Sequence, residues 1–107
     1  MSSAEHAALL KEALEELALQ GYFAWPNRTG AAHIDGRFIP FGKKGSGDIL
    51  IVLPPHGRHC EAEGKTGDAV QSKAQKVHQR MVEKNGGLYL IFRSKEDLLS
   101  QLRAAGY

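Results

Sequence analysis

The chain has 107 residues, a formal net charge of +2, 42% hydrophobic residues and 24% charged residues. These values are ordinary for a globular protein, and the length leaves room for one domain, residues 1–107, with one modest core. No run approaches the ~18 apolar residues of a membrane span, and the N-terminus lacks the pattern of a signal peptide. A single cysteine excludes an intrachain disulfide and a cysteine-rich zinc site. We therefore expect a cytoplasmic protein that does not associate with membranes.

Residues 3–20 have the pattern of a first helix. Ser2 or Ser3 can cap its start, since a serine hydroxyl accepts hydrogen bonds from the first free backbone N–H groups. Glu5 suits the first turn, and Gly21 can end the helix. The helical spacing predicts an apolar stripe that packs on the core, formed by Leu10, Ala13, Leu14 and Leu17.

A short strand at residues 22–25 and a small hairpin are expected next. Asp35-Gly36 is a tight-turn signal between two short runs of strand-forming residues. The loop that follows carries Lys43, Lys44 and Ser46 and leads directly into Asp48. It lacks the spacing of a phosphate-binding P-loop. It is either a surface loop kept soluble by its lysines or, as we favour, a loop that contacts an anionic substrate.

Residues 47–65 are the stretch around which the chain is organised. Ile49 to Leu53 is an unbroken apolar run, as expected of a strand buried on both faces. Pro54-Pro55 and Gly57 turn the chain back. In the returning strand, side chains alternate between two sets: Cys60, Ala62 and Gly64 on one face, Glu61, Glu63 and Lys65 on the other. This charged face is a candidate active site, the alternative being a solvated surface hairpin.

The residue types on this face suit a metal site. Asp48 and Glu63 offer the hard oxygen ligands that Mg²⁺ prefers, and Gly64 leaves its backbone carbonyl accessible as a further ligand. Lys65 can orient or help deprotonate a water, or offset charge that builds up on a phosphate. Glu61 has three open interpretations: a support behind the ligands, a ligand itself, or a solvated carboxylate.

These residues resemble the core of a known nuclease superfamily. Asp48, fourteen intervening residues and Glu63-Gly64-Lys65 match the pattern of the PD-(D/E)XK nucleases, and more narrowly their virus-type replication-repair nuclease (VRR-NUC) branch. The narrower resemblance rests on Asn27-Arg28-Thr29-Gly30, on Gln75 ten residues after Lys65, and on residues 86–94. It extends over nearly the whole chain.

The resemblance implies a stand-alone DNA endonuclease of phage or bacterial type, with Mg²⁺ or Mn²⁺ as its cofactor and a role in DNA replication or repair. It implies that Asp48 and Glu63 bind the metal, that Lys65 acts on the attacking water and that Gln75 positions it. Glu5 is either a further metal-linked carboxylate or a residue that only favours the helix dipole. Stand-alone members resemble Holliday-junction resolvases, so we expect a homodimer that binds DNA, including branched DNA.

Residues 68–84 are predicted to form the central helix. Its buried stripe is expected at positions of helical spacing: Val70, Ala74, Val77 and Met81. A polar line beside that stripe, Gln71, Gln75 and His78, is placed to face the site. We assign contacts with the DNA backbone to residues whose side chains can bind phosphate: Arg28, Lys43, Lys44, Ser46, Lys73 and His78.

Residues 88–93 read as a second apolar strand, which should pair parallel to a strand of the hairpin, and Ser94 caps a last helix. The expected fold is therefore α/β: a restriction-endonuclease-like core with a small mixed sheet flanked by helices, in the order α-β-β-α-β-α. The alternative function is a catalytically silent nucleic-acid-binding module on the same fold. It is disfavoured because Asp48, Glu63 and Lys65 are all present.

Overall fold

A computed structural model describes residues 3–107, and all statements below concern those residues. The elements follow in the order α1 (Ala4–Leu19), β1 (Phe23–Pro26), β2 (Gly30–Ile34), β3 (Arg37–Phe41), β4 (Ile49–Leu53), β5 (Arg58–Gly64), α2 (Lys73–Lys84), β6 (Leu88–Phe92) and α3 (Lys95–Ala104). The expectation of a mixed α/β fold with a small mixed sheet and three helices is confirmed. The strands β1, β2 and β3 lie between the first helix and the predicted β4–β5 hairpin.

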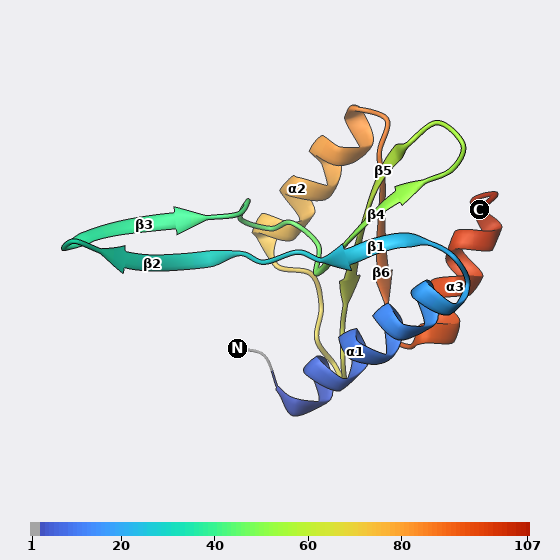
Figure 1. The fold of residues 1–107 in the computed structure, drawn as a ribbon, viewed down its shortest axis with the longest axis horizontal. Coiled ribbons are helices and arrows are strands. Elements are labelled where there is room, and N and C mark those ends of the chain that lie inside the picture. The colour runs from blue at the N-terminus through green and yellow to red at the C-terminus, as the bar shows by residue number, and fades with distance from the viewer. Residues whose placement is uncertain (1–2) are drawn as a thin grey trace.

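The main sheet has the strand order β1-β4-β5-β6. Strand β4 pairs antiparallel with both β1 and β5, whereas β6 pairs parallel with β5, as predicted. Figure 1 shows α2 on one face of this sheet and α1 with α3 on the other. Strand β6 lies at an edge of the sheet, yet α2 and α3 pack against it. This cover explains why an edge strand can be so apolar.

The hydrophobic core lies on the α1 and α3 side of the sheet. Ile49, Ile51 and Leu53 from β4 are fully or almost fully buried there, while the two residues between them are half-buried. The prediction of a strand buried on both faces therefore holds completely for one face only. Cys60 and Ala62 of β5 are buried in the same core, as the predicted alternation requires. The opposite face of β5 carries Glu61 and Glu63 and is covered by α2.

Helix α1 agrees with the prediction to within one residue at each end. The hydroxyl of Ser3 accepts a hydrogen bond from the backbone N–H of His6 at 3.0 Å, so Ser3 is the N-cap. Ser2, the alternative cap, lies outside the described residues. The helix buries Leu9, Ala13 and Leu17 against the sheet, whereas Leu10 and Leu14 of the predicted stripe are only partly buried. Burial of this stripe contributes about 1.5–3 kcal/mol per large side chain.

The prediction for α2 was wrong in its start and in its buried face. The helix begins at Lys73, after the N-cap Ser72, and not at residue 68. The predicted apolar stripe faces solvent: Val70 is 74% exposed, Val77 43% and Met81 52%. The reason is that the sheet beneath α2 presents carboxylates, so the polar line of the helix turns inward to meet them. Val82 is the buried apolar residue of α2.

The predicted small hairpin is confirmed as β2 and β3, which form their own two-stranded sheet. Its turn places Asp35 and Gly36 at positive φ, which these residue types tolerate. Figure 1 shows this hairpin reaching out from the body of the molecule as an arm. Large apolar side chains of the arm are exposed, among them Phe38 at 65% and Ile34 at 52%. No helix among residues 3–107 is long and apolar enough to cross a membrane.

Candidate active site

Asp48 is held at the entry to β4 by two sets of hydrogen bonds. The backbone N–H of Asn27 donates to the Asp48 carbonyl at 2.8 Å, and the Asn27 amide donates to Ser46 Oγ and the Gly47 carbonyl, both at 2.8 Å. Asp48 Oδ2 accepts a hydrogen bond from the Gly64 N–H at 2.9 Å, which ties the carboxylate to the end of β5. The polar segment after β1 thus fixes the loop that positions Asp48.

Glu63, Lys65 and Gln75 form one connected group between β5 and α2. Gln75 Nε2 donates to Glu63 Oε1 at 2.8 Å, and Lys65 Nζ donates to Gln75 Oε1, also at 2.8 Å. Gln75 Oε1 accepts a further hydrogen bond from the Ser72 N–H at 2.9 Å, as part of a capping box at the start of α2. These three hydrogen bonds fix the orientation of the Gln75 amide, which in turn positions the Glu63 carboxylate and the Lys65 ammonium.

Glu63 is a buried carboxyl group whose charged form is poorly stabilised by the described residues around it. Its Oε2 atom is buried and has no hydrogen-bond partner. Burial, and after it the nearby Asp48 carboxylate, raise the pKa of Glu63 to about 8, although Lys65 at 3.9 Å partly offsets them. A cation bound beside Oε2 would relieve both the missing contact and the repulsion.

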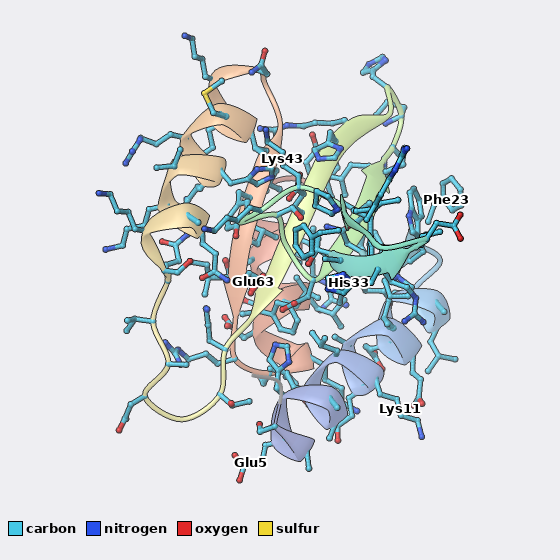
Figure 2. All side chains as sticks on the ribbon, turned by 90° about the vertical axis from the view of Figure 1, so that its left-hand side faces the viewer. Glu5, Lys11, Phe23, His33, Lys43 and Glu63 are labelled. Carbon is cyan, nitrogen blue, oxygen red and sulfur yellow. The ribbon has the colours of Figure 1, made fainter. Side chains whose placement is uncertain are left out.

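His6, which the assignment of site residues from sequence left out, reaches this end of the sheet from the first turn of α1. Its Nε2 atom lies 3.2 Å from Asp48 Oδ2 and 3.2 Å from the Gly64 carbonyl oxygen. Both neighbours are acceptors, so Nε2 carries the hydrogen and donates it. Glu5 is exposed, and Figure 2 shows it at the outer end of α1, pointing away from Glu63. The structure therefore does not bring Glu5 to the site.

A cavity of about 280 Å³ opens at this point. His6, Glu63, Gly64 and Lys65 line it, so an imidazole, a carboxylate, a backbone carbonyl and an ammonium face one space. The fold thus joins the first helix to the end of β5 around a small polar cavity.

Glu61 sits two residues earlier on the same face of β5, in a second polar cluster. Its Oε1 accepts from the Gly47 N–H at 2.8 Å and pairs with His78 Nε2 at 2.8 Å, and its Oε2 pairs with His59 Nε2 at 2.6 Å. Burial alone would raise the pKa of Glu61, but the hydrogen bonds from His59 and Gly47 and the nearby His78 outweigh it and lower the pKa. Glu61 is thus a support that joins β5, α2 and the loop before Asp48.

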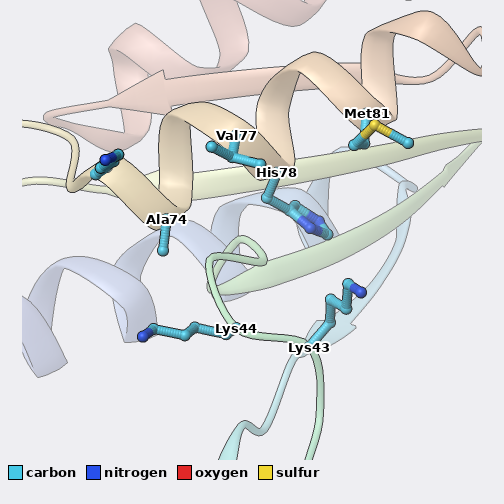
Figure 3. A pocket seen from close by; sticks show the side chains of 7 residues that line it. Lys43, Lys44, Ala74, Val77, His78 and Met81 are labelled. Carbon is cyan, nitrogen blue, oxygen red and sulfur yellow. The ribbon is translucent and has the colours of Figure 1, made fainter.

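Four of the six residues assigned to DNA contact gather at a second, larger groove of about 600 Å³. Figure 3 shows Lys43 and Lys44 on the loop facing α2, with the side chain of His78 projecting from the helix toward that loop. Lys73, the first residue of α2, also lines the groove. The apolar residues Ala74, Val77 and Met81 complete the lining of this groove.

The loop that carries the two lysines is pressed against α2. A Cβ atom on Gly45 would lie only 2.3 Å from the Ala74 carbonyl oxygen, and the Gly45 φ of +87° also favours glycine. Tyr89 anchors the same loop by donating its hydroxyl hydrogen to the Gly45 carbonyl at 3.3 Å. Arg28 is exposed and does not line the groove, and Ser46 accepts a hydrogen bond from Asn27.

The donor set around Glu63 fits a divalent metal ion on one observation: the buried Oε2 atom lacks a partner that a cation would supply. Within residues 3–107, no three His, Cys, Asp or Glu side chains already stand in an arrangement that holds a metal ion. A bound ion would therefore draw on the Gly64 carbonyl and water in addition to side chains, or move one of the side chains.

Comparison with known proteins gave no match to a protein-family model, to a curated protein or to a solved structure. The resemblance to the PD-(D/E)XK nucleases thus stays a prediction, and the functional proposal rests on the two carboxylates, the lysine and their surroundings.

Proposed function

We propose that the chain is a metal-dependent DNA endonuclease with a restriction-endonuclease-like core of the VRR-NUC type. The antiparallel β4–β5 pair, the helix α2 and the parallel strand β6 follow one another as that core requires. The single observation that carries the proposal is the buried carboxylate of Glu63 beside Asp48 and Lys65, whose Oε2 atom has no hydrogen-bond partner. A charge cluster of this kind costs folding free energy and is therefore a signature of a functional site.

In this proposal Asp48, Glu63 and the Gly64 carbonyl hold Mg²⁺ or Mn²⁺. When bound, the metal stabilises charge on the phosphate and lowers the pKa of the attacking water. Lys65, fixed by Gln75 at 2.8 Å, faces the same cavity, where it orients the water and offsets negative charge on the phosphate. Water attacks the phosphorus and the bond to the 3′ oxygen breaks. The products are a 5′-phosphate and a 3′-hydroxyl.

The larger groove supplies the contact with the DNA backbone in this account. Lys43, Lys44 and Lys73 surround it, and lysines near a phosphodiester chain release counterions and so supply sequence-independent affinity. The groove and the cavity both adjoin the start of α2, since Ala74 lines the groove and Gln75 accepts a hydrogen bond from Lys65, which lines the cavity. A single strand that passes over the start of α2 meets both.

A homodimer that cuts branched DNA, such as a Holliday junction, is part of the proposal. Two symmetric cuts need two active sites, and one domain of this size contains one such cluster. The exposed apolar side chains of the β2–β3 arm support association, because monomers rarely leave several large apolar residues together in water. We place the activity in the cytoplasm, where cellular DNA replication and repair take place in bacteria.

A catalytically silent nucleic-acid-binding module on the same fold is the second candidate. The observation that favours it is the lack, within the described residues, of three metal-binding side chains already arranged around one point. The two candidates share the lysine groove and differ only in whether Asp48 and Glu63 bind a metal that supports cutting.

Cleavage of a synthetic four-way junction and of a matched linear duplex, with and without Mg²⁺ or Mn²⁺, tests the proposal. Lys65→Ala runs alongside, since loss of cutting in this variant excludes a contaminating nuclease. We expect metal-dependent, paired symmetric nicks in the junction that disappear in the variant.

Cutting of both substrates would keep the nuclease but remove the preference for branched DNA. Binding without cutting, in every metal tested, would replace the proposal with the silent module. Absence of both binding and cutting would contradict both candidates.

A further inference from the structure

His6 stands at the mouth of the site, where its imidazole meets two oxygen atoms, one at the entry to β4 and one at the end of β5. Its single Nε2–H group is shared between Asp48 Oδ2 and the Gly64 carbonyl, each at 3.2 Å, a long distance for either bond. The two oxygens are the very atoms that the proposed function assigns to the metal. The imidazole also lines the cavity of about 280 Å³ together with Glu63 and Lys65.

We propose that His6 is a ligand of the metal and that it makes the site select a first-row transition ion such as Mn²⁺ over Mg²⁺. This inference rests on the proposed function, because it concerns the same metal. It adds a nitrogen ligand from α1 to the oxygen ligands of β4 and β5. Binding through Nε2 would require the neutral imidazole to carry its hydrogen on Nδ1 instead of Nε2, so the two hydrogen bonds of Nε2 would be exchanged for one bond to the metal.

The separations among these atoms suit a shared ion. Two ligands at right angles around an ion, each about 2.1 to 2.2 Å away, lie about 3 Å from one another. Nε2 of His6 is 3.2 Å from Asp48 Oδ2 and 3.2 Å from the Gly64 carbonyl oxygen, so each of these two separations is compatible with a pair of ligands on one ion. The orphaned Oε2 of Glu63 would become a fourth donor once a side chain shifts toward the ion, since no three such side chains among residues 3–107 already stand around one point.

The chemistry of the ligand sets the preference. Mg²⁺ is a hard ion that takes oxygen ligands and keeps its waters, and an imidazole nitrogen gains little by displacing one of them. First-row transition ions accept imidazole readily, so a site of one nitrogen and three oxygens favours them. A set made only of Asp48, Glu63 and Gly64 has no such bias.

Metal titration of the purified protein without DNA tests the inference directly. Calorimetry would measure the affinities of Mn²⁺ and Mg²⁺ for three proteins: the wild type, His6→Gln and the matched control Glu5→Gln. The glutamine at position 6 keeps an N–H donor, and the control changes the neighbouring exposed residue of the same helical turn. We expect Mn²⁺ to bind at least about tenfold more tightly than Mg²⁺ to the wild type.

In His6→Gln the Mn²⁺ affinity should fall by about tenfold or more while the Mg²⁺ affinity changes by less than about threefold. Glu5→Gln should match the wild type for both ions. Electron spin echo spectroscopy of the Mn²⁺-loaded protein provides a second readout, because a directly bound imidazole nitrogen modulates the echo. We expect this modulation in the wild type and its loss in His6→Gln.

The outcomes separate the inference from the proposed function. Binding of both ions with similar affinity and without nitrogen modulation would overturn the role of His6 and leave the metal-dependent nuclease intact. No binding of either ion to any of the three proteins would overturn the metal centre itself, and with it both proposals.

Discussion

Two carboxylates on one face of β5 meet opposite surroundings. Glu61 and Glu63 are two residues apart and almost equally buried, at 4% and 5% exposed. Both oxygens of Glu61 are paired, by Gly47, His59 and His78, whereas Oε2 of Glu63 has no partner. The pKa of Glu61 is lowered, and that of Glu63 is raised to about 8. We call the Glu61 cluster, in which both carboxylate oxygens are paired, the closed site, and the Glu63 cluster, in which Oε2 has no partner, the open site.

The difference separates a structural carboxylate from a candidate functional one. A buried charge that is fully hydrogen-bonded holds elements together, here β5, α2 and the loop before Asp48. A buried carboxyl group with a free oxygen and a second carboxylate beside it resists ionisation, and such an arrangement is typical of a site that binds a ligand. Burial alone would not have told these two glutamates apart.

The largest effect is expected at the open site. Glu63→Gln keeps an oxygen that can accept from Gln75 but removes the charge that attracts a metal. Metal-dependent cleavage should fall by roughly a thousandfold or more, which corresponds to about 4 kcal/mol of transition-state stabilisation. Single-turnover cleavage rates at saturating metal measure this. A variant that retained full activity would show that Glu63 is not a metal ligand.

The closed site should respond in stability instead. Glu61→Ala leaves the Gly47 N–H and the two histidines without their buried acceptor, and we expect a loss of about 3 kcal/mol in the free energy of unfolding. Urea unfolding at neutral pH measures it, with Glu63→Gln as the matched variant on the same face. A larger loss of unfolding free energy in Glu63→Gln than in Glu61→Ala would show that Glu63, and not Glu61, is the structural carboxylate.

The raised pKa of Glu63 predicts a pH dependence of the metal-free protein. Because this carboxyl holds its proton up to about pH 8 when folded but only to about 4.5 when unfolded, the folded state binds more protons between these values. Stability contributed by Glu63 therefore falls as pH rises through this window, by at most about 1.4 kcal/mol per pH unit.

The measurement compares the free energy of unfolding of the wild type with that of Glu63→Gln from pH 5 to 8, in the presence of a chelator. The difference should favour the variant increasingly as pH rises. A constant difference across this range would mean that Glu63 titrates normally.

The smallest effect concerns the groove beside the closed site. Lys43→Ala should weaken DNA binding severalfold and lower the slope of log affinity against log salt by about one. Neither stability nor metal affinity should change, since Lys43 contacts neither cluster through any hydrogen bond or ion pair described for residues 3–107. An unchanged salt slope would remove this lysine from the DNA-contacting surface.

Sequence periodicity predicted correctly which face each residue of β5 occupies, because that depends on local rules. An apolar run, a Pro-Gly turn and strict alternation fix which face each residue of β5 occupies, so Glu61, Glu63 and Lys65 were expected on one side. The pairing of Ile49 with Ala62 then brings Asp48 to the end of β5. The polar line of α2 that includes Gln75 was likewise expected to face the site.

Helix α2 shows where the same rules fail. Apolar residues at helical spacing indicate a buried stripe only if the surface opposite is apolar, and here that surface carries Glu61 and Glu63. The predicted start at residue 68 was also wrong, although the sequence carries a signal for the true start: Ser72 and Gln75 have the spacing of a capping box, and the structure contains that box. The side chain of Gln75 therefore caps α2 and contacts Lys65 and Glu63 at the same time.

His6 shows a different limit. Its position one turn before Leu10 places it on the inward side of α1, which is a signal present in the sequence. What it meets there depends on the packing of α1 against β5, a contact between residues 58 positions apart. No local pattern specifies that contact.

The most direct test of the central claim is thermal unfolding with and without Mn²⁺ for the wild type and two matched variants, Glu63→Gln and Glu61→Gln. Mn²⁺ should raise the unfolding temperature of the wild type and of Glu61→Gln by about 5 °C or more, and leave that of Glu63→Gln unchanged. The opposite pattern, with the metal effect lost in Glu61→Gln and kept in Glu63→Gln, would contradict the assignment of the open carboxylate as the metal site.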